Sequence, residues 1–218
     1  MRILILPAMA IVLAAFMGSC KSSGGAKTFC DTVCLKEPIR FTLEDHPYKP
    51  YVYITASNCN ADTLIWSYQD MGVNRKIVLA NLLETSVKLN KDFVKCYIKD
   101  TSYAWLRFND CKNGRGYLLK IPFNKRDNIG RKSSALNSID PKFSVAESLI
   151  AYSDRGNVFA EDMETGKSAM MTFGEKADID YDAIHETIDS VNITPSHIWV
   201  KVKLKEGWKV IEKNITLK

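Results

Sequence analysis

Five acidic side chains in one short segment are the sharpest candidates for chemistry in this sequence. The segment is DIDYDAIHETID, residues 178–189, and the side chains are Asp178, Asp180, Asp182, Glu186 and Asp189. Calcium binds carboxylate and carbonyl oxygens, so a loop that turned these groups toward one point could hold it. The segment therefore predicts calcium as the candidate cofactor, and we expect none besides it.

The spacing of these oxygens resembles the calcium loop of the EF-hand family, and the resemblance implies a bound calcium ion. Two positions depart from the family, because Ala183 stands where the loop needs Gly and Asp189 replaces the bidentate Glu. Pro195 and the strand-like flanks do not supply the two helices of that family. The alternative is a strand edge, with Ile179 and Tyr181 inward and the Asp side chains in water.

The first residues of the chain indicate export from the cytoplasm. Arg2 is the only charge before Lys21, and the seventeen residues 3–19 are almost wholly apolar. A membrane-spanning helix needs roughly 20 such residues, and Pro7 interrupts this stretch. A positive end, an apolar middle and small residues at the boundary are typical of a secretory signal peptide, which we assign to residues 1–19.

The four residues that end this stretch, Met17-Gly18-Ser19-Cys20, resemble the lipobox of bacterial lipoproteins. The resemblance implies that Cys20 carries a diacylglyceryl thioether and becomes the first mature residue, with acyl chains that hold the protein on a membrane. Met17 departs from the Leu that the family prefers. Lys21 stands where the family often has Asp for retention in the inner membrane, so the resemblance implies the outer membrane, on its periplasmic or surface side. The alternative is an ordinary secreted protein with an unmodified cysteine.

Residues 20–36 are expected to be the lipid anchor and a flexible tether, because KSSGGAK (21–27) is rich in Gly and Ser. The rest of the chain, residues 37–218, is expected to be a single all-β domain. The full sequence has 218 residues, of which 46% are hydrophobic and 25% charged. This composition is that of a folded chain and excludes a disordered one.

Five cysteines remain after the anchor: Cys30, Cys34, Cys59, Cys96 and Cys111. An exported protein folds in an oxidising compartment, so disulfides are expected among them. Their number is odd, and the sequence does not fix the pairing. Cys30 and Cys34 are close enough in sequence to close a small loop. A zinc site is the rival interpretation, but the CxxC pairs that it would need are missing.

Charge is unevenly distributed along the chain, although the net charge is only +5. Residues 112–132 hold seven basic side chains and one acidic one, whereas residues 154–189 hold ten acidic and three basic ones. A basic segment can bind an acidic glycan or lipid headgroups. Nucleic acid is not expected as a partner, because the segment lacks regularly placed aromatic side chains for base stacking. We expect the two segments to face each other.

Short alternating runs rich in β-branched and aromatic residues recur along the chain and predict strands almost throughout. Four of them carry an aromatic in mid-strand: TLIWSY (63–68), YAWLRF (103–108), LIAYS (149–153) and HIWVKV (197–202). The aromatics are Trp66, Trp105, Tyr152 and Trp199, separated by 39, 47 and 47 residues. Another candidate strand precedes and follows each run. The one helical candidate, residues 78–88, is short.

Repeats of 40 to 50 residues with three or four strands are the sequence sign of propeller blades. Residues 155–174 (RGNVFAEDMETGKSAMMTFG) also resemble a blade of the quinoprotein-like propellers, with Gly156, Ala160, Asp162, Thr165, Gly166 and Lys167 matching. The tryptophan that often ends this motif is missing. We therefore expect four antiparallel meander repeats in a small β-propeller-like domain, with the four aromatics at equivalent buried positions. The alternative is a β-sandwich or barrel.

No enzyme motif of the GxSxG or HExxH kind is present, and the three histidines, His46, His185 and His197, are scattered. We therefore expect a non-catalytic binding or scaffold module with a protein partner in the cell envelope. The alternative is an envelope enzyme that processes a glycan or another ligand. Such an enzyme would need two or more carboxylates that converge in a concave site.

Overall fold

The computed structural model describes residues 34–69, 71 and 74–218, and their strands lie in four open sheets. The predicted signal peptide, Cys20, most of the tether and Cys30 lie outside the described residues. Among the helices of the described part, none is long and apolar enough to cross a bilayer. The all-β prediction is confirmed.

Sheets A and B contain the N-terminal strands, and both are antiparallel throughout. Sheet A has the order β1 (Ile39–Thr42), β2 (Pro50–Ser57), β3 (Asn60–Tyr68) and β4 (Arg75–Val78). Sheet B has the order β5 (Lys95–Lys99), β6 (Tyr103–Asn109), β7 (Gly116–Pro122) and β8 (Gly130–Lys132). Between them the chain forms α1 (Leu79–Leu83), within the predicted helical candidate, and a 3-10 helix, η1 (Lys91–Phe93).

Sheets C and D contain the C-terminal strands. Sheet C has the order β10 (Leu149–Asp154), β11 (Asn157–Asp162) and β12 (Ser168–Thr172). Sheet D has the order β15 (Gly207–Asn214), β14 (His197–Leu204), β13 (Ile188–Thr194) and β9 (Phe143–Val145). A second 3-10 helix, η2 (Ile184–Glu186), precedes β13. The β9–β13 pair is parallel, whereas every other strand pair of the two sheets is antiparallel.

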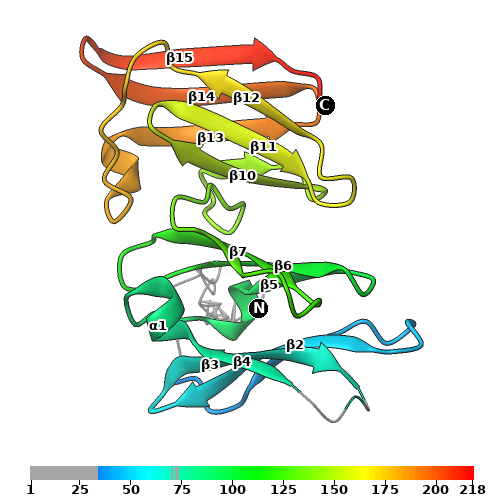
Figure 1. Cartoon of the computed structure of the whole chain (residues 1–218). Coiled ribbons are helices and arrows are strands. Elements are labelled where there is room, and N and C mark those ends of the chain that lie inside the picture. The colour runs from blue at the N-terminus through cyan, green and yellow to red at the C-terminus, as the bar shows by residue number, and fades with distance from the viewer. Residues whose placement is uncertain (1–33, 70, 72–73) are drawn as a thin grey trace, which may run out of the picture.

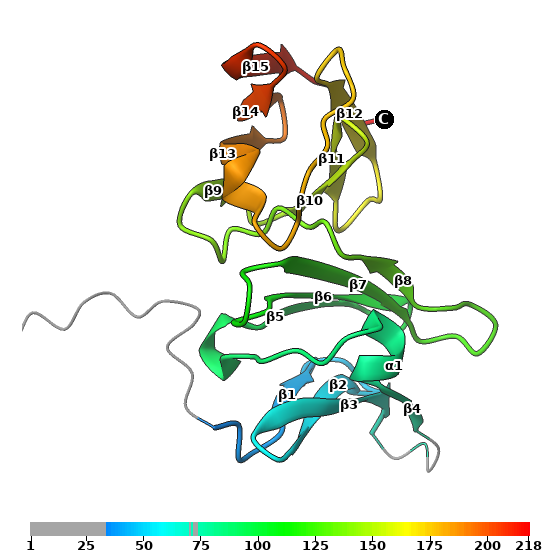
Figure 2. The ribbon, with the colours of Figure 1, turned by 90° about the vertical axis from the view of Figure 1, so that its left-hand side faces the viewer.

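The alternation of side chains along each strand builds two separate cores. Val52 and Ile54 of β2 face Leu106 and Leu119 of sheet B in the first core, while Tyr53 between them points outward. The second core lies between sheets C and D and is formed by side chains such as Ala160, Val191 and Val200. The molecule is therefore two sandwiches, A with B and C with D, as Figures 1 and 2 show.

A third cluster joins the two sandwiches. Trp105 and Leu118 on the outer face of sheet B pack against Ala135, Ile150 and Met163 of the C-terminal half. Figure 2 shows sheet A at one end of the molecule and sheets C and D at the other, with sheet B between them. The four sheets thus do not close a ring in the described part of the chain. The structure has the stacked sheets of the sandwich alternative and does not show a propeller.

Three of the four predicted repeats are present as consecutive antiparallel strands. They are β2–β3–β4, β5–β6–β7 and β13–β14–β15. The third repeat differs, because β9 pairs with β13 through the register Val191↔Phe143 and leaves β10 at the edge of sheet C. The single domain expected over residues 37–218 contains two cores, which the third cluster connects.

Candidate binding surfaces

The four aromatics predicted to be equivalent lie in three different environments. Trp66 is buried in the first core, where its indole N–H donates to the Pro122 carbonyl at 2.9 Å. Trp105 is buried on the opposite side of sheet B, in the cluster that also contains half-buried Tyr152. Trp199 is half-buried on the outer face of sheet D, between buried neighbours that point into the second core. The prediction of equivalent buried positions is therefore wrong.

Cations lie over the aromatic rings where the sandwiches meet. The Lys120 ammonium group lies 4.5 Å from the ring centroid of Tyr103 and 4.9 Å from that of Trp105. Lys132 lies 4.5 Å from the ring centroid of Tyr152. Such cation–π contacts stabilise by about 0.5–1 kcal/mol each at exposed sites. Tyr103 and Lys120 also line a surface pocket of about 410 Å³.

The predicted contact between the basic and acidic segments is present at two points. Lys120 forms an ion pair with Glu161 at 3.5 Å, across the boundary between the sandwiches. Arg115 pairs with Asp182 at 3.1 Å, and the same carboxylate accepts a hydrogen bond from the Asn113 amide at 2.8 Å. Some charged side chains of each segment therefore form ion pairs between the two sandwiches.

The carboxylates proposed as a calcium loop do not converge. Asp182 turns to Arg115, whereas Asp189 pairs with Lys201 at 3.1 Å and with Lys142 at 3.4 Å. Hydrogen bonds from Lys201 and Ser190 hold the pKa of Asp189 below its usual value. Within the described part of the chain, no three His, Cys, Asp or Glu side chains gather as metal ligands.

The remaining three carboxylates of that segment, Asp178, Asp180 and Glu186, are exposed to solvent. The Asp180 carboxylate accepts the backbone N–H of Asp182 at 2.9 Å, which closes a local turn. This arrangement matches the water-facing alternative for the Asp side chains. Ile179 and Tyr181 are partly buried against the second core, as that alternative also required. The segment is not a strand edge, however, because residues 178–187 form turns and the 3-10 helix η2, and β13 begins only at Ile188.

A pocket of about 500 Å³ lies between the β6–β7 turn and η2. Inside it, His185 Nε2 lies 2.8 Å from the buried carboxylate of Asp140, and Nδ1 lies 3.1 Å from the Ile188 carbonyl. Both ring nitrogens therefore lie beside oxygen atoms of the protein itself. The imidazole thus links η2 to the turn that contains Asp140. The sequence did not reveal this pair, because 45 residues separate its members.

The outer face of sheet D carries two of the three large apolar side chains that are exposed among the described residues of the C-terminal half, and the third is Met170 of β12. We call it the distal face and define it by Trp199, Lys201, Lys203, Trp208 and Val210. Trp208 is 45% exposed and Val210 is 54% exposed. The register pairs Lys203 with Trp208 and Lys201 with Val210, so these side chains lie beside one another on adjacent strands. In the sequence GWKVIEKN (207–214), Trp208 and Val210 are two residues apart, and side chains at this spacing lie on the same face of a strand. This alternation is the sequence signal that could have predicted the apolar patch.

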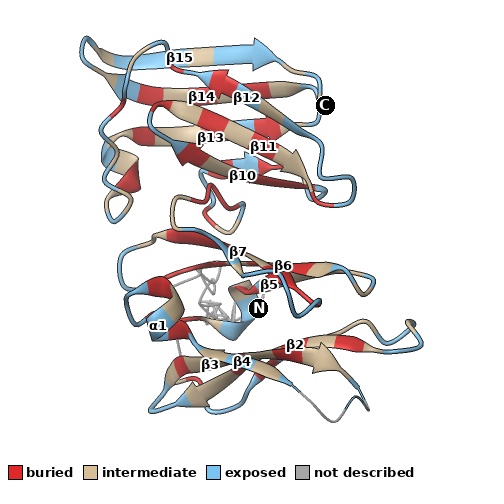
Figure 3. Cartoon of the chain, viewed as in Figure 1, coloured by how far each residue is buried: buried red, intermediate tan, exposed pale blue. Residues whose placement is uncertain are grey.

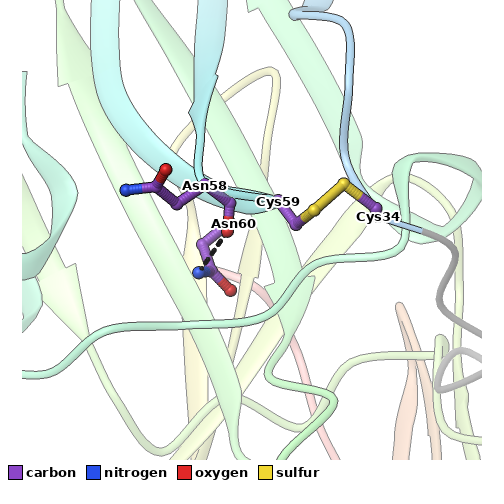
Figure 4. The surroundings of a disulfide bond; sticks show 4 residues. All are labelled: Cys34, Asn58, Cys59 and Asn60. Carbon is purple, nitrogen blue, oxygen red and sulfur yellow. Dashed lines mark hydrogen bonds between the residues drawn. A yellow bond between two sulfur atoms is a disulfide. The ribbon is translucent and has the colours of Figure 1, made fainter.

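The chain enters the fold beside sheet A. Cys34, the first described residue, is joined by a disulfide to Cys59 in the β2–β3 turn, as Figure 4 shows. Asn58 and Cys59 in this turn both have positive φ values, 49° and 66°, as expected for a two-residue hairpin turn of type I′. Disulfide bonding is thus present, but Cys34 pairs with Cys59 and the small Cys30–Cys34 loop is not formed.

Cys96 on β5 is a free thiol, and burial raises its pKa to about 12. A thiol is reactive as the thiolate, so this shift makes Cys96 less reactive at neutral pH than an exposed cysteine. Cys111 is half-buried, and its backbone N–H donates to the Lys88 carbonyl at 2.9 Å.

Comparisons of the chain with protein-family models, with curated proteins and with solved structures give no match.

Proposed function

We propose that this chain is a lipid-anchored protein of the outer membrane whose two sandwiches form a non-catalytic module that binds a protein partner in the cell envelope. The lipobox-like sequence at residues 17–20 supports the anchor. The distal face supports the binding role, and it is the single observation that carries the proposal.

The position of the distal face suits this role. Cys34 and its disulfide lie beside sheet A, and sheet D lies at the other end of the molecule (Figures 1 and 2). An anchor upstream of Cys34 would therefore leave sheet D at the far end from the point of attachment. Tryptophan is enriched in protein interfaces because it supplies a large apolar area with little loss of side-chain entropy.

The partner's surface should be acidic around an apolar centre. Residues 197–218 contain six lysines and two glutamates. Lys201 and Lys203 belong to the distal face itself, and the Lys201 ammonium lies 5.8 Å from the Trp208 ring centroid. A patch of exposed apolar side chains with a basic rim excludes a basic partner and favours one of opposite charge.

Site-directed photo-crosslinking in intact cells tests the binding role. A photoreactive side chain in place of Trp208 should give one reproducible adduct with an acidic envelope protein. The control places it at Tyr48, which is 62% exposed in the β1–β2 loop of the opposite end. The same adducts from both positions, or none from Trp208, would contradict the proposal.

Lipid labelling tests the anchor. Cys20→Ala should leave an unprocessed precursor that no longer takes up labelled fatty acid, whereas Cys96→Ala should be processed and labelled normally. Normal maturation of the Cys20 variant would show that the anchor does not depend on this thiol.

The pocket around His185 favours a second candidate function, an envelope enzyme that processes a glycan or another ligand. Two carboxylates, Asp140 and Glu186, line this pocket. Asp140 is occupied by His185, so Glu186 would have to act as the proton donor or acceptor. Cleavage of cell-wall glycan that is lost in Glu186→Gln would support the enzyme over the binding module.

A further inference from the structure

The open edges of the four sheets differ greatly in length. Short edge strands protect a sheet from pairing with other chains, because they present few free backbone groups. Seven of the eight edge strands of the described sheets have three to six residues: β1, β4, β5, β8, β9, β10 and β12. The eighth, β15, has eight residues and is exposed along most of its length (Figure 3).

The next longest edge, β10, and one of the two five-residue edges, β12, are partly covered by the chain itself. At β10, the Leu136 N–H donates to the Ala151 carbonyl at 2.9 Å and the Ser153 N–H to the Ser134 carbonyl at 3.0 Å. At β12, Ser168 exchanges two backbone hydrogen bonds with Lys218. No comparable backbone bonds cover the outer edge of β15 among the described residues.

The register shows which backbone groups of β15 point outward. The Lys203 N–H donates to the Thr187 carbonyl at 2.7 Å, on the side of β14 that faces away from β15. Lys203 and its partner Trp208 therefore form a non-hydrogen-bonded antiparallel pair, and the backbone groups of both point away from each other. Because this pattern repeats every second residue, Val210 and Glu212 also point their N–H and C=O groups outward.

The side chains beside the edge of β15 indicate which sequence pattern an added strand should have. Trp208, Val210 and Glu212 point to the side of the distal face, whereas Lys209, Ile211 and Lys213 alternate with them on the other side of the sheet. Lys209 forms an ion pair with Glu206, and the Lys213 ammonium donates to the Met170 carbonyl at 3.2 Å. A strand added here would therefore place one face beside Trp208 and Val210 and the other beside the positive charges of Lys209 and Lys213. In the antiparallel register that places Ile211 opposite itself, a second copy of this chain would bring Lys209 against Lys213, which disfavours self-pairing in that register.

We propose that β15 is a docking edge for an extended segment of the protein partner, which adds to sheet D as a further strand and alternates apolar with acidic side chains. The proposal rests on the proposed function and names how the partner is held. Main-chain hydrogen bonds to the outward groups of Trp208, Val210 and Glu212 supply affinity, and the alternation supplies selectivity.

A proline at an outward position gives a direct test. Val210→Pro removes an N–H that points away from β14, so the β14–β15 ladder stays intact, and proline is tolerated on a strand edge of this kind. Val210→Thr is the matched control, since it changes the side chain and keeps the N–H. Thermal unfolding of both variants checks that each is folded.

The probe is a fluorescent eight-residue peptide in which Val alternates with Glu. It should bind the wild-type protein, and its affinity for Val210→Pro should be at least tenfold lower than its affinity for Val210→Thr, which carries the same loss of the Val side chain. On binding, hydrogen exchange of the backbone amides of residues 208, 210 and 212 should slow at least tenfold. A peptide with Val alternating with Lys, and one with the four Val and four Glu in separate blocks, should bind at least tenfold more weakly.

Equal binding of the probe to the Pro and Thr variants, or no binding to the wild-type protein, would overturn strand addition. The crosslink from Trp208 separates the two proposals. If that crosslink persists at full yield in Val210→Pro, the distal face binds a partner without strand addition, and the proposed function stands alone. If the probe behaves as expected but no envelope protein is crosslinked, the edge binds strands and the proposed function fails.

Discussion

The ammonium group of Lys120 and the carboxylate of Glu161 lie 3.5 Å apart and join the basic segment of the first sandwich to the acidic segment of the second. The Lys120 side chain is 39% exposed and that of Glu161 is 20% exposed. Water therefore screens the pair, although the cation also lies over Tyr103 and Trp105. The pair aligns the two sandwiches and contributes little to the stability of the fold.

A double-mutant cycle measures this contribution. Lys120→Gln, Glu161→Gln and the double variant should give a coupling free energy below about 1 kcal/mol in chemical unfolding, as for other exposed pairs. The coupling should shrink in 1 M salt, where the screening length is about 3 Å. A coupling well above 2 kcal/mol, or one that salt leaves unchanged, would contradict this description of the pair.

Two tryptophans predicted to be alike should respond differently to truncation. Trp105→Ala should lower the free energy of unfolding by about 3–5 kcal/mol, because it empties a buried site between the sandwiches. Trp199→Ala removes a half-buried ring from the distal face and should cost about 1 kcal/mol or less. Urea unfolding at equilibrium measures both, and equal losses would show that the distal face is packed like a core.

These two tryptophans also show what sequence patterns could predict. Alternation placed Trp199 on one face of its strand correctly, but it could not tell which face would be covered, since that depends on the sheet stacked against it. The same limit applies to β9, whose predicted partner β10 lies next along the chain and whose actual partner, β13, does not. Strand existence follows from local periodicity, whereas sheet pairing follows from contacts far apart in sequence.

The candidate sites were predictable to a similar extent. The ion pairs of Asp182 and Glu161 with basic residues followed from the opposite charge of the two segments. Asp182 and Asp189 of the predicted calcium loop instead pair with Arg115 and Lys201. Those partners lie 67 and 12 residues from the acids they bind, beyond what a local motif describes.

The disulfide gives a prediction about both connectivity and stability. Peptide mapping without reduction should recover Cys34 joined to Cys59. The bond spans a sequence separation of 25, so the double variant Cys34→Ser, Cys59→Ser should lose about 3 kcal/mol of unfolding free energy. Recovery of Cys30 joined to Cys34 would contradict this pairing. Cys96→Ser does not open the loop and serves as the control for loss of a sulfur.

The thiol of Cys96, which packs against the first core, should make stability fall at high pH. Burial raises its pKa from 9.0 to about 12, and the charge of Arg107 offsets only part of this shift. Below pH 9 the thiol keeps its proton in both the folded and unfolded chain. Between pH 9 and 12 the unfolded chain releases the proton and the folded chain retains it, so unfolding becomes easier by about 1.4 kcal/mol per pH unit.

Cys96→Ala removes this titration and leaves the tyrosines unchanged. Between pH 7 and pH 10.5, the wild-type protein should therefore lose about 2 kcal/mol more unfolding free energy than the variant. Iodoacetamide should label Cys96 at neutral pH only after denaturant is added, because the thiolate is the reactive form. Parallel pH profiles for the two proteins, together with rapid labelling of the folded chain, would show that this thiol lies in water and outside the core.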